Sequence, residues 1–139
     1  MPAPNSAFAQ WLVCRGRIDE AITVAERGRA RDPLAVSGQD IGWILFLAHR
    51  YEQSIREFRS TLAVRPDDSA VEWYLGFALT ANGQPDQAIP FLENALSLTH
   101  RSPGVIGVLI RAYAHACRRS DALRLLAELK QPRKAGYTP

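Results

Sequence analysis

Apolar and small residues recur along this chain at intervals of three and four positions, and they do not alternate strictly with polar ones. Residues 18–25 and 73–79 show this spacing most clearly. Such spacing places apolar side chains on one face of an α-helix. Turn signals such as Asp32-Pro33 and Asn82-Gly83 separate the periodic segments. The pattern predicts eight helices, near residues 4–15, 18–30, 37–48, 51–64, 69–82, 85–98, 103–116 and 119–130.

Prolines and short polar residues mark several of the predicted helix ends. The segment 66–69 combines a proline stop with acidic residues that can cap the next helix. Pro85 and Pro103 suit the first position of a helix, and Ser102 is a candidate cap for the helix that follows it. Pro90 falls inside the sixth predicted helix, where it removes one backbone hydrogen bond. We therefore expect a bend or a loosening there.

The helices are organised as an internal repeat. A small residue followed four positions later by an apolar or small residue occurs four times along the chain, at nearly even spacing. Each copy is preceded, at a matching offset, by a second apolar-periodic stretch that includes Leu12, Leu45, Leu79 or Tyr113. Because each predicted helix is too short to be stable alone, stacking of the units must bury the core. The four pairs are Ala21 with Ala25, Ser54 with Phe58, Ala88 with Leu92, and Ala122 with Leu126.

At these residues the chain resembles the tetratricopeptide repeat family. That pattern reads Trp-x2-Leu-Gly-x2-Tyr, then Ala-x3-Phe, then Pro, and it recurs every ~34 residues. The chain departs from it in two ways. The first Trp is absent from its place in all four units, and Trp73 stands one position late. Pro33 and Pro66 close the first two units, but His100 and Lys134 occupy the closing position in the others.

The resemblance implies an all-α fold, a right-handed helical solenoid of about four helix-turn-helix repeats. We expect a single domain over 1–139, with repeats at about 2–34, 35–68, 69–102 and 103–134 and a tail at 135–139. It also implies a scaffold that binds a peptide or protein partner in a concave groove, which the first helix of each unit lines. The candidate partner-binding residues carried over onto this chain are Gln10, Gln39, Trp43, Phe46, Trp73, Tyr74, Phe77, Arg111 and His115.

The predicted groove is aromatic at its centre and polar at its ends. Trp, Tyr and Arg are the residue types enriched at binding hot spots, and Arg111 can pair bidentately with a partner carboxylate. The alternatives are that some of these aromatic rings pack between helices and that Arg111 is simply solvated. Trp73 and Tyr74 are adjacent on one helix, so we expect one of them to be exposed.

Some relatives grip a C-terminal carboxylate with a clamp of Lys and Asn side chains on the groove helices. In this chain Ser6, Gln10 and Asp40 stand near the corresponding places and lack the positive charge of such a clamp. The sequence therefore argues against that class of ligand.

Composition and motifs exclude several other functions. With 47% hydrophobic and 22% charged residues the chain is an ordinary globular protein, and no apolar run is long enough for a membrane span. No phosphate loop, dinucleotide motif or nucleophile elbow occurs, and the three histidines lack placed catalytic partners. We expect no enzyme, cofactor or metal site. We expect Cys14 and Cys117 to be buried thiols in a cytoplasmic protein.

The charge of the chain is uneven. Residues 111–134 hold seven basic and two acidic residues, although the whole chain carries only +3. The simplest interpretation is a solvated helix and tail, and the sharper one is a contact for an acidic partner. Direct binding of nucleic acid is the weaker alternative, because the basic residues spread around two helices and a pI of about 9.2 is only suggestive.

The last predicted helix is rich in leucine and is not followed by a polar capping unit. We therefore expect the chain to be part of something larger, or to associate with itself through the fourth unit. Residues 41–51, and the Leu-rich segment 126–130 followed by Gly136-Tyr137, resemble the repeat arrays of bacterial regulators and receptor-type signalling proteins. That resemblance implies, as an alternative function, a self-associating sensory module of a larger regulator.

Overall fold

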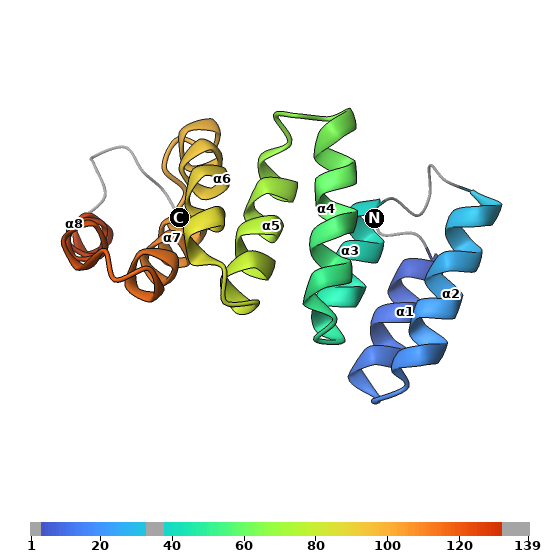
Figure 1. Ribbon diagram of the computed structural model, residues 1–139. Coiled ribbons are helices and arrows are strands. Elements are labelled where there is room, and N and C mark those ends of the chain that lie inside the picture. The colour runs from blue at the N-terminus through green and yellow to red at the C-terminus, as the bar shows by residue number, and fades with distance from the viewer. Residues whose placement is uncertain (1–3, 33–37, 132–139) are drawn as a thin grey trace.

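The computed structural model describes residues 4–32 and 38–131, and within those ranges it contains eight α-helices and no strand (Figure 1). Every observed helix begins and ends within one residue of its predicted limits, so the predicted all-α repeat fold is confirmed. The helices are α1 (Pro4–Cys14), α2 (Ile18–Arg31), α3 (Gly38–Leu47), α4 (Tyr51–Val64), α5 (Ser69–Ala81), α6 (Pro85–Leu98), α7 (Pro103–His115) and α8 (Arg119–Lys130).

The helices form an elongated array, with α1 and α2 at one end and α8 at the other (Figure 1). Each odd-numbered helix packs against the even-numbered helix that follows it, and it also contacts the next odd-numbered helix. Within the described residues the backbones of the even-numbered helices stay farther apart, and long side chains such as Arg29 and Glu57 join one even-numbered helix to the next. The odd helices therefore crowd together on the inner side of a curve, and the even helices spread apart on its outer side.

Two glycines allow the helices of the central units to approach closely. A Cβ atom built on Gly42 would lie 2.8 Å from Phe58 Cδ1, and one built on Gly76 would lie 2.9 Å from Leu92 Cδ1. The second unit adds a polar link, because the buried Ser54 hydroxyl donates a 2.8 Å hydrogen bond to the Gly42 carbonyl. Ala21, Ser54 and Ala88 are fully buried, as the repeat predicted, and Ala122 is partly buried.

The turns inside the four units share a backbone feature that the sequence patterns did not reveal. One residue at the equivalent position of each turn adopts a positive φ: Gly16 (79°), His49 (62°), Gly83 (78°) and Cys117 (62°). Glycine adopts this conformation without strain, whereas the other residue types do not. The turn geometry is therefore retained in two units that lack the favourable residue.

Other details of the helix ends confirm or correct the sequence predictions. Asp68 caps α5, because its carboxylate accepts a hydrogen bond from Val71 N at 3.2 Å. Ser102 occupies the cap position of α7, but its side chain makes no capping hydrogen bond there. α6 continues through Pro90, whose side chain is exposed.

The prediction for the cysteines was wrong, because both thiols are exposed. Cys14 ends α1, and Cys117 occupies the positive-φ position of the turn before α8. Both residues lie at the ends of helices and not on their packed faces, and the helical spacing of apolar residues cannot distinguish these places.

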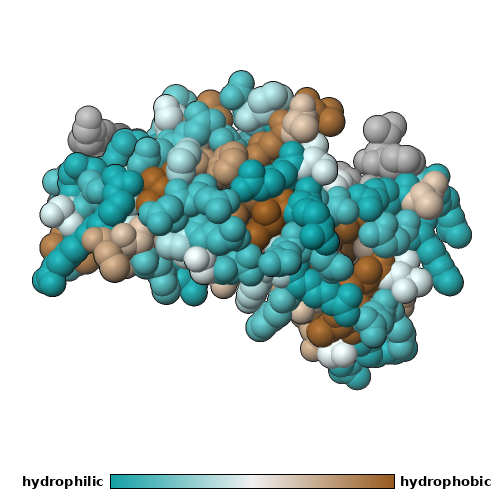
Figure 2. Space-filling view, viewed as in Figure 1, coloured by the Kyte–Doolittle hydropathy of each residue, from teal (hydrophilic) through white to brown (hydrophobic). Residues whose placement is uncertain are grey.

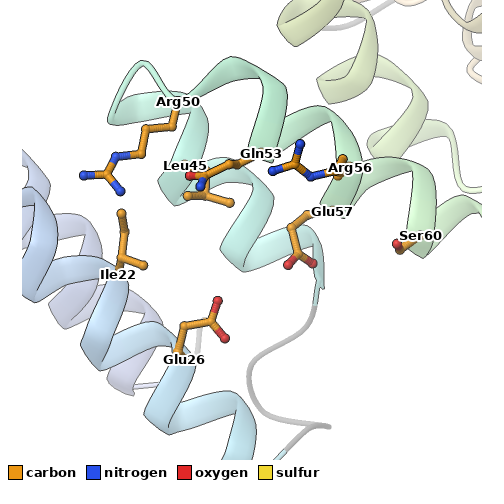
Figure 3. Close-up of a pocket in the computed structure, with 8 residues that line it drawn as sticks. All are labelled: Ile22, Glu26, Leu45, Arg50, Gln53, Arg56, Glu57 and Ser60. Carbon is orange, nitrogen blue, oxygen red and sulfur yellow. The ribbon is translucent and has the colours of Figure 1, made fainter.

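The core of the molecule is divided in two. One buried cluster joins α1, α2 and α3, and a larger one extends from α4 through α8. On the outer side a hollow of about 260 Å³ separates α2 from α4, and Ile22 and Leu45 contribute apolar side chains to its lining (Figure 3). The visible surface is mostly hydrophilic, and hydrophobic side chains show in seams between helices and over the α1 end (Figure 2).

Candidate functional site

Five aromatic rings from α3 and α5 lie together on the odd helices of the array. We call Trp43, Phe46, Trp73, Tyr74 and Phe77 the aromatic ladder. All five residues are half-buried, so each presents part of its surface to solvent and packs the remainder. The ladder lies on α3 and α5, two of the odd-numbered helices that crowd together on the inner side of the curve.

The rings of the ladder contact one another across the two helices. Trp43 stacks on Phe46 with centroids 5.2 Å apart, and it contacts Tyr74 at 5.0 Å. Phe77 lies 5.9 Å from Phe46 and 5.5 Å from Trp73. Offset-stacked and tilted ring pairs at these separations are favourable. The ladder is therefore a continuous cluster of aromatic rings that pack on one another.

The expectation that either Trp73 or Tyr74 would be exposed was wrong. Both are half-buried, and their rings stack with centroids 5.4 Å apart at an interplanar angle of 29°. Tyr74 also stacks on Phe58 of α4, which draws its ring toward the core while Trp73 turns toward α7. The Trp73 Nε1 atom is buried without a hydrogen-bond partner. An unpaired buried donor has a cost, and such exceptions deserve a functional explanation.

The remaining predicted site residues lie toward the two ends of the inner helices. Gln10 on α1 and Gln39 on α3 are half-buried, whereas Arg111 and His115 on α7 are exposed. The structure therefore brings the five aromatic candidates into one cluster. The four polar candidates lie outside that cluster, on α1, at the start of α3 and on α7.

Sequence reasoning missed two aromatic residues that extend the ladder. Tyr51, at the start of α4, lies 5.6 Å from Phe46, and Phe58 lies 5.9 Å from Tyr74. Phe58 was visible as the apolar member of its repeat pair, but its contact with the next unit was not. Tyr51 stands directly after the turn at His49, and the period of a repeat does not indicate on which side of a turn a ring will pack.

An apolar slot lies beside the ladder, between the start of α5 and the start of α7. Its volume is about 210 Å³. Trp73 contributes one wall, and Gly104, Val105 and Ala70 contribute small or apolar surface to the others. A Cβ atom built on Gly104 would lie 3.6 Å from Trp73 Cζ2, so the glycine keeps the slot open next to the indole. The slot could receive one aliphatic side chain of a bound segment.

A buried carboxylate on α5 holds the ladder's helix against α6. Glu72 on α5 is buried, and Asn94 Nδ2 on α6 donates to both of its oxygens at 2.8 Å. Burial raises the pKa of Glu72 above its usual value, and the hydrogen bonds from Asn94 oppose that rise only in part. The pair joins α5 to α6 and so fixes the helix that carries Trp73, Tyr74 and Phe77.

A second buried polar contact fixes α7. The Tyr113 hydroxyl donates to Glu93 Oε1 of α6 at 2.6 Å, and the Arg118 guanidinium lies over the Tyr113 ring at 4.7 Å from its centroid. Burial, with the hydrogen bond to the Glu93 carboxylate, raises the pKa of Tyr113 to about 12. Tyr113 is therefore a structural donor that keeps its proton.

The hollow between α2 and α4 is lined by charges of both signs, and Arg50, Glu26 and Glu57 point toward it (Figure 3). Arg29 donates to both oxygens of Glu57, at 2.9 and 3.2 Å, and Arg50 donates to Asp19 at 2.7 Å. These ion pairs connect the first two units across their junction, so the charged residues around the hollow have a structural role. Among the described residues, no three His, Cys, Asp or Glu side chains gather to hold a metal ion.

The comparisons agree with this architecture. Residues 79–134 match the family model described as the tetratricopeptide repeat. That part of the chain carries the tetratricopeptide repeat. No curated protein matches the sequence.

Several solved structures share the fold over most of the chain. MamA from RS-1 is 18% identical, with a TM-score of 0.75 over 93% of this chain and 75% of that one. MamA from MSR-1 is 22% identical, with a TM-score of 0.73 over 87% and 70%. TPR-like repeats of a putative kinesin light chain from Podosopora anserina are 18% identical, with a TM-score of 0.71 over 91% and 72%. At these identities the likeness concerns the fold alone.

The matched tetratricopeptide repeats include α6, α7 and α8, where the family's Trp and closing Pro are missing. In the part of the chain that the structure describes, no helix is long and apolar enough to cross a membrane.

Proposed function

We propose that this chain is a protein-interaction scaffold that binds an extended or helical segment of a partner on its inner surface. The observation that carries the proposal is the aromatic ladder, because five half-exposed aromatic rings are held together by their own contacts. Aromatic side chains lose little conformational freedom on binding and dominate interface energies. A partner would contribute apolar anchors, one of them for the slot beside Trp73.

Arg111 gives the proposed groove a polar contact. It is exposed on α7, the helix next to Trp73 and Phe77, and its planar fork can hold a partner carboxylate with two hydrogen bonds. The proposed partner segment therefore carries apolar residues and an acidic side chain. The clamp of Lys and Asn stays excluded by sequence.

A selection from a random peptide library displayed on phage, with the whole chain as bait, tests this proposal. Peptides that bind should be enriched in apolar and acidic residues, and calorimetry should show tenfold or greater loss of affinity in Trp43→Ala and in Arg111→Ala, about 1.4 kcal/mol or more. Arg119→Ala on α8 is the matched control and should bind normally, because it removes an exposed arginine outside the groove. Selected peptides that bind both arginine variants equally well would contradict the proposed site.

A second candidate function is self-association through the fourth unit. It is favoured by the exposure of two leucines on α8, Leu123 (51% exposed) and Leu129 (41% exposed). A charge placed at Leu129 should lower the oligomeric state if this candidate is correct. An unchanged mass distribution in light scattering would count against it.

We also propose the cytoplasm as the location of the chain and a single domain as its organisation. The two exposed, unpaired thiols of Cys14 and Cys117 support a reducing compartment. The chain of helix contacts from α1 through α8 supports one domain.

A further inference from the structure

The first helix exposes two aromatic side chains at positions that the repeat normally buries. Phe8 and Trp11 on α1 are each 49% exposed. Their equivalents in the next three units are 1% exposed or less, because each lies against the preceding unit. These equivalents are Ile41 and Ile44, Leu75 and Ala78, and Leu109 and Ala112.

The two aromatic rings form a single surface at this end of the array. Phe8 and Trp11 are stacked with centroids 5.9 Å apart and an interplanar angle of 15°. The Arg15 guanidinium lies 5.3 Å from the Trp11 ring centroid. Hydrophobic side chains are visible over α1 at this end of the molecule (Figure 2). We call Phe8 and Trp11 the leading face.

The other end of the array has the complementary exception. Leu123 on α8 corresponds to Ile55 and Ile89 of the second and third units, which are 8% and 4% exposed, yet Leu123 is 51% exposed. We call the side of α8 that carries Leu123 the trailing face.

The interior of the same molecule shows how such faces fit together. α4 packs on α5 and α6 packs on α7, and at both junctions the residues equivalent to the trailing face and the leading face are buried in one core cluster. α1, which carries the leading face, lies at one end of the array, and α8, which carries the trailing face, lies at the other (Figure 1). The chain therefore presents both halves of a junction that it already forms internally.

We propose that the trailing face on α8 of one copy docks on the leading face on α1 of a second copy, in the geometry of the internal junctions. This inference deepens the second candidate function, because it gives the fourth unit a specific partner surface. The contact joins two different faces, so each dimer retains one free face of each kind and assembly continues as an open chain.

The charges at the two ends indicate that the contact is apolar and not ionic. Within the described residues, α7 and α8 with the turn between them carry five basic and two acidic side chains, and α1 and α2 with their turn carry five basic and three acidic ones. Ends of like charge repel each other, and salt screens that repulsion. Added salt should therefore strengthen the association.

Complementation of two single variants tests the proposal. Trp11→Glu places a charge on the leading face and Leu123→Glu places one on the trailing face, each at a half-exposed site where the helix tolerates glutamate. Sedimentation velocity of the whole chain should show a ladder of masses that grows with concentration. Each variant alone should be monomeric, because every contact between two identical variant chains would include the face that carries the added charge.

An equimolar mixture of the two variants should give a dimer and no larger species. The intact trailing face of Trp11→Glu meets the intact leading face of Leu123→Glu, and the other two faces are both charged. Leu98→Glu is the matched control, because Leu98 is 43% exposed on α6 away from both ends. It should assemble like the unmodified chain, and circular dichroism should show all variants to be equally helical.

Three results would overturn the proposal, and they differ in whether self-association through the fourth unit is also excluded. If Trp11→Glu still dimerises and Leu123→Glu does not, like faces of α8 pair, and self-association through the fourth unit survives without the leading face. If the unmodified chain is monomeric at every concentration, both ideas fail. If the mixture of variants stays monomeric, the two faces do not fit each other. Binding of selected peptides to the groove is measured on different residues and is unaffected by any of these results.

Discussion

Close packing of α5 on α6 depends on the absence of a side chain at Gly76, and this dependence can be measured. A Cβ atom at this position would lie 2.9 Å from Leu92 Cδ1 and closer still to Leu92 Cγ and Cδ2. Leu92 is fully buried, so it has little room to move. Gly76→Ala should therefore force the two helices apart or drive Leu92 out of its rotamer.

The magnitude follows from two opposing terms. Replacing a mid-helix glycine by alanine stabilises a helix by about 1 kcal/mol. Overpacking in a filled core costs about 1–3 kcal/mol, and an overlap with three atoms of one side chain belongs in the upper part of that range. Gly76→Ala should then lower the free energy of unfolding by about 1–2 kcal/mol.

Gly107 on α7 supplies the matched control. It is also inside a helix, but a Cβ atom built on it would meet nothing within 4 Å. Gly107→Ala should therefore raise the free energy of unfolding by about 1 kcal/mol. Urea titrations followed by circular dichroism measure both variants under one condition. A Gly76→Ala variant that is as stable as Gly107→Ala would refute the close approach of α5 and α6.

Three further predictions concern the turns and the buried polar groups. Gly83→Ala should lower the free energy of unfolding by about 1 kcal/mol, because alanine disfavours the positive φ of 78° at this uncrowded site. Cys117→Gly, at a φ of 62°, should leave the free energy of unfolding unchanged or raise it in the same urea titration. A Gly83→Ala variant that is more stable than the unmodified chain would contradict this. The raised pKa of Glu72 means that the folded state holds the proton more tightly than the unfolded chain, so stability is lost as pH rises from the unfolded pKa through the folded one. Glu72→Gln should lack that loss when urea midpoints are compared between about pH 4 and pH 8, and parallel pH profiles would refute the assignment. Tyr113→Phe should remove one phenol ionisation near pH 12 from an absorbance titration. The stability that the Tyr113 proton provides should fall as pH rises from 10 to about 12. A variant whose titration near pH 12 matches that of the unmodified chain would show that Tyr113 ionises normally.

The helices could be predicted because their signals are local. Apolar spacing, prolines at the starts of α6 and α7, and the acidic cap at Asp68 all act within one or two turns of helix. The repeat then extended these signals across the chain, since small residues recur at the equivalent position of each unit. The solenoid fold follows from the repeat, because short amphipathic helices have no other way to bury their apolar faces.

The details of the site could not be predicted, because they depend on contacts between units. The sequence around Tyr51 does not indicate that its ring will contact Phe46. Trp73 and Tyr74 are adjacent in sequence, which suggested that one of them would be exposed, yet their rings stack and both residues are half-buried. The exposure of Cys117 depends on a turn whose positive φ is set by the helix pair around it. Sequence spacing indicates which face a residue occupies, but not what the neighbouring unit places against it.

The central claim is that the inner surface around the aromatic ladder is where a partner binds, and the three tryptophans allow a direct test. Trp43 and Trp73 belong to the ladder, whereas Trp11 lies on the leading face of α1. The chain can be labelled with 5-fluorotryptophan, its fluorine resonances assigned with Trp→Phe variants, and a phage-selected peptide titrated in. We predict that the resonances of Trp43 and Trp73 shift together while that of Trp11 does not. A shift of Trp11 alone, or of none of the three on addition of a peptide that binds by calorimetry, would contradict the claim.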